Sequence, residues 1–137
     1  PRAIFWLQEA FLFNFLRLPI PPRPSLERGM IYELRVYECY AGKLPELHER
    51  FANHTMKLFE KYGIQSVGYW VTDVGPSNQT LTYLLAFKDA NHRVEAWSKF
   101  RVDPEWLRVV EESHKDGILV KNFSNQTLIP TPYSPLQ

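Results

Sequence analysis

The stretch MIYELRVYE, from Met30 to Glu38, has the alternation of a half-buried β-strand. Successive side chains of a strand point to opposite faces, so one face receives Ile31, Glu33, Arg35 and Tyr37. The other face receives Tyr32, Leu34, Val36 and Glu38. One face is therefore mainly apolar, while the other carries a carboxylate, a guanidinium and a phenol in succession. This polar row is either solvent-facing surface or the floor of a binding site.

The residues that follow predict a helix and a β-hairpin. Apolar residues recur at helical spacing from about Lys43 to Tyr62, which indicates an amphipathic helix. Gly63 stands where a left-handed glycine ends such a helix. Ser66–Asp73 and Thr80–Lys88 are rich in β-branched and aromatic residues and flank the turn-forming sequence VGPSNQ. We expect these two segments to pair as antiparallel strands.

The remaining chain predicts two helices and a last strand. Asp89 can cap a helix that carries Val94 and Trp97. Asp103 is a stronger helix start, because the proline after it loses no hydrogen bond at the first helical position. The last predicted elements are the helix after Asp103, with Leu107 and Val110 directed inward and its end at Gly117, and a strand over Ile118–Leu128.

The resulting order, β-α-β-β-α-β, predicts an α+β, ferredoxin-like fold. In this fold a four-stranded antiparallel sheet carries its helices on one face. The apolar face with Tyr32, Leu34 and Val36 would then have no helix over it. A wide apolar face in water favours association. We therefore expect a homodimer in which two sheets face each other and form a barrel.

If the polar face of the first strand points toward the helices, its charges lie in a semi-enclosed space. Trp70 and Tyr83, on the neighbouring strands, can flank the same space. The predicted ligand-binding residues are therefore Glu33, Arg35, Tyr37, Trp70 and Tyr83. A buried guanidinium needs a counter-charge, so Arg35 pairs either with Glu33 or with an external anion. The first alternative is a structural tie between sheet and helices, and the second is a ligand pocket.

Composition restricts the classes of partner and cofactor. The 137 residues are 45% hydrophobic and 23% charged, which is typical of one folded domain. The net charge is +1 without a cluster of Lys and Arg, which argues against nucleic acid as a partner. Cys39 is the only cysteine and fits a reducing compartment, so we expect a cytoplasmic location. The four histidines include no pair at i,i+4 and no Gly-rich phosphate loop occurs, so no metal or cofactor is predicted.

The proline-rich run PIPPRPS, Pro19 to Ser25, divides the chain. The apolar segment before it is too interrupted to be an integral membrane span, because it contains Gln8, Glu9, Asn14 and Arg17. We expect residues 1–29 to be an N-terminal extension, either upstream or cloning-derived sequence or a docking segment, and residues 30–137 to be the folded domain. Organellar import through residues 1–29 is a minor alternative to the cytoplasmic location.

Several short motifs resemble the NIPSNAP family in its single-domain, bacterial type. They are MIYELRVY, GKLPE, GYW, GP followed by NQ, DPEW and LIPTPYSPL, and together they extend from Met30 to about Leu136. The resemblance implies a dimeric α/β barrel with a ferredoxin-like fold and supplies no established reaction. Relatives are similar in fold to small cofactor-independent monooxygenases, and animal relatives are mitochondrial proteins linked to vesicle traffic and mitochondrial quality control. Tyr83 and Leu85 replace a histidine and a tryptophan that relatives often carry, so no role of that histidine transfers to this chain.

Two functions follow from these observations. The first is a dimeric binding or scaffolding domain with a small apolar or anionic ligand between sheet and helices. The alternative is a cofactor-independent monooxygenase that acts on a small aromatic substrate, with Glu33 as the base. Direct contact between Glu33 and Arg35 favours the scaffold, whereas a pocket closed by Tyr, Trp and Arg side chains favours the enzyme.

Overall fold

The computed structural model describes residues 29–137. The predicted N-terminal extension lies outside the described residues, apart from Gly29. Within them the elements, in chain order, are β1 (Ile31–Cys39), α2 (Leu44–Arg50), the π-helix η2 (Phe51–Thr55), α3 (Met56–Lys61), β2 (Gln65–Val71), β3 (Thr80–Phe87), α4 (Ala90–Arg101), α5 (Pro104–Ser113) and β4 (Val120–Leu128).

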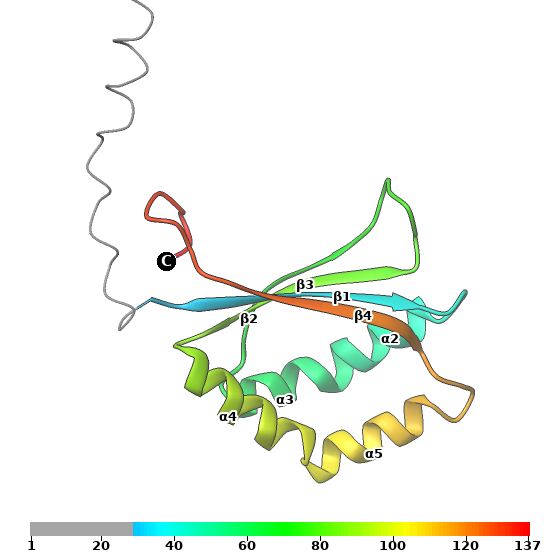
Figure 1. Ribbon diagram of the computed structural model, residues 1–137. Coiled ribbons are helices and arrows are strands. Elements are labelled where there is room, and N and C mark those ends of the chain that lie inside the picture. The colour runs from blue at the N-terminus through cyan, green and yellow to red at the C-terminus, as the bar shows by residue number, and fades with distance from the viewer. Residues whose placement is uncertain (1–28) are drawn as a thin grey trace, which may run out of the picture.

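The strands form one antiparallel sheet in the order β2-β3-β1-β4. Figure 1 shows all the labelled helices on one face of this sheet, which confirms the predicted ferredoxin-like arrangement. No helix of residues 29–137 covers the opposite face. The chain after β4 turns back over one end of that face, where the Tyr32 hydroxyl donates a hydrogen bond to the carbonyl of Gln137 (3.2 Å).

The register of the sheet decides which side chains meet the helices. Arg35 of β1 lies opposite Tyr83 of β3 and Asn125 of β4, so these three side chains share a face. The helix-facing side chains of β3 are fully buried, and they are Leu81, Tyr83, Leu85 and Phe87. They form the core together with apolar residues of the helices. The polar row of β1 therefore points inward, toward the helices.

The predicted first helix is one helical stretch with a π segment in its middle. Leu47, Phe51 and Leu58 are buried, as the apolar spacing predicts. In the π segment the N–H of Met56 donates to the carbonyl of Phe51, five residues earlier. The Thr55 hydroxyl donates to the carbonyl of Arg50 (3.2 Å), which also spans five residues. This extra residue in the turn changes which side chains face the sheet beyond it.

Both predicted helix starts are present, and one packing prediction is wrong. Asp89 accepts a hydrogen bond from the N–H of His92 (2.7 Å), and Asp103 accepts bonds from the first free N–H groups of α5. Leu107, predicted inward, is 55% exposed, whereas Val109 is buried. Helix α5 packs against α2 with the face that carries Val109. Leu107 is two residues away, which is about 200° around a helix, so it lies on the opposite, exposed face.

The last strand begins two residues later than predicted. Ile118 is exposed, and β4 starts at Val120. Leu119 fills the buried position before the strand, and its carbonyl accepts a hydrogen bond from the N–H of Tyr40 (3.0 Å). The chain is therefore anchored in the core by Leu119 before the regular pairing of β4 with β1 begins.

The variant Gly63→Ala should lower the free energy of unfolding by about 1 kcal/mol, because Gly63 has φ +69° and a side chain there is strained. Its added methyl group would also lie 3.3 Å from Nε2 of His92. Chemical denaturation measures the change. Gly29→Ala is the control, since nothing lies within 4 Å of Gly29 and its backbone is not left-handed. Equal stability of both variants would contradict this account of the turn.

Candidate functional site

The buried carboxylate of Glu33 is the centre of the polar face. It is 0% exposed and accepts five hydrogen bonds of 2.8–2.9 Å. The donors come from β1, α4 and β4, and they are Arg35 Nη1, Arg93 Nε and Nη2, Trp97 Nε1 and Asn125 Nδ2. We call Glu33 and these four donor residues the Glu33 cluster. Every lone-pair direction of this carboxylate is engaged.

Arg35 extends the cluster toward the middle of the sheet. Its Nε donates to the hydroxyl of Tyr83 (2.8 Å) and its Nη2 to the hydroxyl of Tyr37 (3.0 Å). The guanidinium carbon lies 4.7 Å from the centroid of Trp97, and within 6 Å of three more rings. Such contacts with aromatic faces stabilise a desolvated cation. Each nitrogen of the Arg35 guanidinium thus has a hydrogen-bond partner within the chain.

The pKa values follow from these contacts. Burial alone would raise the pKa of Glu33, but hydrogen bonds from Arg93, Asn125 and Trp97 and the charge of Arg35 lower it to about 2. Burial disfavours the charged form of Arg35, yet the phenol oxygens of Tyr83 and Tyr37 and the Glu33 carboxylate raise its pKa. Burial raises the pKa of Tyr83 well above its ordinary value. At neutral pH Glu33 is therefore a carboxylate, Arg35 a guanidinium and Tyr83 a neutral phenol.

Four of the five predicted site residues lie together, and one does not. Glu33, Arg35, Tyr37 and Tyr83 form one hydrogen-bonded group. Trp70 pairs with Thr82 and lies on the opposite face of the sheet, with its ring over Gly68. The reason is the register, which shifts between Ser66 and Gly68 of β2. Tyr69, the neighbour of Trp70 in β2, faces the helices instead, and its ring stacks on Tyr83, with the ring centroids 5.7 Å apart.

Sequence reasoning missed three residues of the Glu33 cluster. Arg93 and Trp97 are four residues apart on α4, so they share a helix face, and this spacing was the available signal. Asn125 alternates with Phe123 and Thr127 on the helix-facing side of β4, which only the register reveals. The sequence places Trp97 on the helix that begins after Asp89. It is buried, and its indole N–H in addition donates to Glu33.

A second buried arginine lies between α2 and α5. Arg50 is 7% exposed, its Nη1 donates to the Ser113 hydroxyl (3.2 Å), and its guanidinium lies 5.4 Å from the Trp106 ring. Among the described residues, its Nε is the buried side-chain polar atom without a hydrogen-bond partner. It borders a cavity of about 240 Å³ whose lining includes the acidic residues Glu46, Glu49, Glu112 and Asp116. These carboxylates disfavour an anion beside Arg50.

Within residues 29–137, no group of three or more His, Cys, Asp and Glu side chains is placed to hold a metal ion. None of the helices found there is long and apolar enough to cross a membrane.

Comparison with known proteins identifies the family. The NIPSNAP family model matches residues 32–135. The chain belongs to the NIPSNAP family. A solved NIPSNAP family protein of unknown function from Agrobacterium tumefaciens is 25% identical, with a TM-score of 0.71 and coverage of 80% of this chain and 96% of that chain.

Two further similarities place limits on what the family name implies. The NipSnap homolog of Dictyostelium discoideum is 23% identical over 107 residues, which are 78% of this chain and 40% of that protein. The chain therefore spans less than half the length of this NIPSNAP relative. A protein from Caulobacter crescentus, described as an antibiotic biosynthesis monooxygenase candidate, has a TM-score of 0.52 and 11% identity over 77% of this chain and 92% of that chain. At that identity the likeness concerns the fold alone.

Replacement of Arg35 should destabilise the fold strongly. Arg35→Ala removes one hydrogen-bond partner of Glu33 and empties a space among four aromatic rings, so we expect a loss of about 3–5 kcal/mol in the free energy of unfolding. Lys99→Ala is the control, because it removes a charge pair with Glu95 that is more than half exposed on both sides. Denaturant titration compares the two variants. A small effect of Arg35→Ala would contradict a structural role.

Acid should weaken the protein through Glu33. Its pKa is lower in the folded chain (about 2) than the ordinary value of 4.5, so its contribution is complete above pH 4.5 and is lost as the pH falls toward 2. With about 1.4 kcal/mol for each pKa unit, the expected loss is about 3 kcal/mol. Unfolding free energies measured across this range should fall steeply for the wild type. Glu33→Gln should have lower stability at neutral pH and a shallower acid dependence, and an unchanged dependence would contradict the assignment.

Proposed function

We propose that this NIPSNAP chain is a homodimeric binding or scaffolding protein that holds a small ligand between its sheet and its helices. The observation that carries the proposal is the direct contact between Glu33 and Arg35 within a fully hydrogen-bonded cluster. Such a cluster fixes the layers of the domain and leaves neither charge free for chemistry. A ligand then binds beside the cluster, where the layers are less tightly packed.

The open face of the sheet supports the homodimer. We define this face by the side chains that point away from the helices and are at least partly exposed. Its apolar residues include Leu34, Val36, Trp70, Leu84 and Leu128, and the polar residues Thr82, Ser124 and Gln126 lie beside them. Glu38 is the charged residue of β1 on this face, and it lies at the end of the strand beside Lys121 (3.7 Å). A face that is largely apolar on β1 and β3, uncharged on β4 next to them, and charged at its margin favours association. A second copy supplies an equally apolar surface.

The oxygenase alternative needs a general base in the site, and the contacts of the site argue against one. A catalytic base is most effective when its pKa lies near the working pH. The pKa of Glu33 is lowered to about 2, and its oxygens are occupied by donors. Tyr83 has a raised pKa and stays neutral. The similarity to the Caulobacter protein extends to the fold and supplies no such residue.

A cytoplasmic location is part of the proposal. Cys39 is the only cysteine of the chain, and its side chain is buried. Burial raises the pKa of its thiol, which makes it a poor nucleophile and a poor target for oxidation. A protein that keeps one unreactive thiol fits a reducing compartment.

Sedimentation velocity at micromolar concentration tests the dimer. The wild type should sediment as a dimer, and Leu34→Glu should sediment as a monomer, because two unpaired carboxylates would be buried against each other. Val94→Glu is the matched control, since Val94 is 63% exposed on α4, and it should remain dimeric. Native mass spectrometry of the same wild-type sample should show a retained small molecule. A wild-type monomer at this concentration would overturn the proposal.

A further inference from the structure

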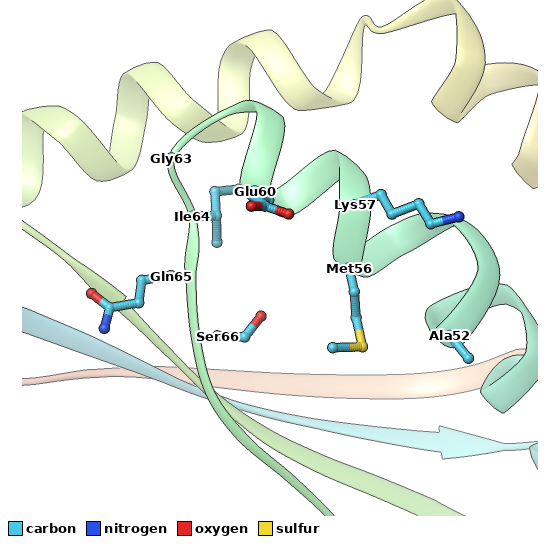
Figure 2. A pocket seen from close by; sticks show the side chains of 8 residues that line it. All are labelled: Ala52, Met56, Lys57, Glu60, Gly63, Ile64, Gln65 and Ser66. Carbon is cyan, nitrogen blue, oxygen red and sulfur yellow. The ribbon is translucent and has the colours of Figure 1, made fainter.

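Two adjoining cavities lie along the edge of the sheet at β2. One has a volume of about 600 Å³ and lies between α3 and the start of β2, where its lining includes Ile64 and Ser66. The other has a volume of about 340 Å³, and its lining includes Phe51, Tyr69 and Leu81, together with Trp70 of the edge strand β2. Ala52 and Met56 line both cavities, so the two form one continuous groove, which we call the β2 groove. Figure 2 shows the Met56 side chain reaching from the helix toward the strand, on the side where Ser66 lies.

The groove lies between two departures from regular secondary structure. On the helix side, the π segment Phe51–Thr55 places Ala52 on the lining and ends next to Met56. On the sheet side, the pairing of β2 with β3 shifts between Ser66 and Gly68, so one residue is extra. Isolated π turns and β-bulges both occur preferentially at functional sites, where they redirect side chains. Here both irregularities border the same space.

The bulge has a specific consequence for two hydroxyl groups. In a regular strand, Ser66 and Tyr69 would point to opposite faces, because they are three positions apart. With the extra residue, both face the helices, and Ser66 Oγ lies 2.6 Å from the hydroxyl of Tyr69. In such a pair one hydroxyl donates to the other, and the second keeps its own proton for another acceptor. The groove therefore places a hydroxyl pair beside the apolar side chains of Ile64, Met56 and Phe51, in a lining that also includes Lys57, Glu60 and Gln65.

We propose that the β2 groove is the ligand site, and that its ligand is a small, elongated, apolar molecule with one carbonyl or hydroxyl group bound by Ser66 and Tyr69. This inference rests on the proposed binding function and names the site and the ligand class. The combined size of the cavities is within the range of small-molecule sites. Met56 adapts to different apolar shapes, because its side chain is unbranched and flexible.

An added peptide strand fits this groove less well. Such a strand needs a regular row of free N–H and C=O groups along the edge of β2. The bulge interrupts that row, and bulges are among the features that protect sheet edges from strand addition. Lys57 and Glu60, which also line the groove, carry opposite charges and so give no preference for a strongly charged ligand.

Nile red, a planar apolar dye with a single carbonyl group, is the probe. Its fluorescence in titrations with the wild-type protein should saturate at one dye per chain. Ala52→Trp should weaken dye binding at least tenfold, because the exposed Ala52 lines both cavities and an indole there fills their junction. The double variant Ser66→Ala with Tyr69→Phe should weaken binding about fivefold through the lost hydrogen bond. Ala41→Trp, at an exposed turn position, is the matched control and should bind dye like the wild type.

The same samples separate a failure of this site from a failure of the proposed function. Sedimentation velocity should show that Ala52→Trp and the double variant remain dimeric. Leu34→Glu should bind the dye as a monomer, because the groove lies within one chain. Dye binding that survives Ala52→Trp, or that is lost in Leu34→Glu alone, would place the dye outside the groove and overturn the inference. Absence of dye binding by a dimeric wild type would also overturn it, while leaving the dimer intact.

Discussion

The buried carboxylate of Glu33 is the constraint on which the rest of the domain depends. A charge without solvent contact is costly unless its oxygens are hydrogen-bonded, and here donors arrive from β1, β4 and α4. Arg93 and Trp97 reach it from one face of α4, so the helix can lie on the sheet in one position only. The cluster therefore specifies how the helical layer is placed, beyond what a purely apolar contact would specify.

This inward charge explains the unusual polarity of β1. A strand on an antiparallel sheet usually directs its apolar residues toward the core and its polar ones toward water. In β1, Glu33 and Arg35 point to the helices, and Leu34 and Val36 point away from them. The polar residues are satisfied by one another inside the domain, so the outward apolar face is left for a second surface. The polarity of one strand thus connects the internal cluster to the proposed dimer.

Local sequence patterns predicted the helices and strands, whereas the pairing of the strands determines which side chains meet at the site. The strand alternation of β1, the caps Asp89 and Asp103 and the left-handed Gly63 are encoded by neighbouring residues, and the structure contains them as predicted. The face of the sheet on which Trp70 lies depends on one extra residue in β2, and the amino-acid composition of the strand does not reveal this bulge. The π segment was equally hidden, because its apolar residues keep a spacing that an ordinary helix also allows. Long-range partners such as Asn125 follow only from the pairing of β4 with β1.

The Glu33 cluster and the β2 groove lie on the same face of the sheet, and Tyr83 connects them. Its hydroxyl accepts a hydrogen bond from Arg35, and its ring packs against Tyr69 and Phe51, which line the groove. The cluster thereby fixes one wall of the groove through two aromatic contacts. On the helix side of the groove, the unbranched Met56 side chain is 42% exposed and can adapt. The fixed wall carries the hydroxyl pair and can select a functional group of the ligand. The adaptable apolar wall can tolerate variation in the rest of the ligand.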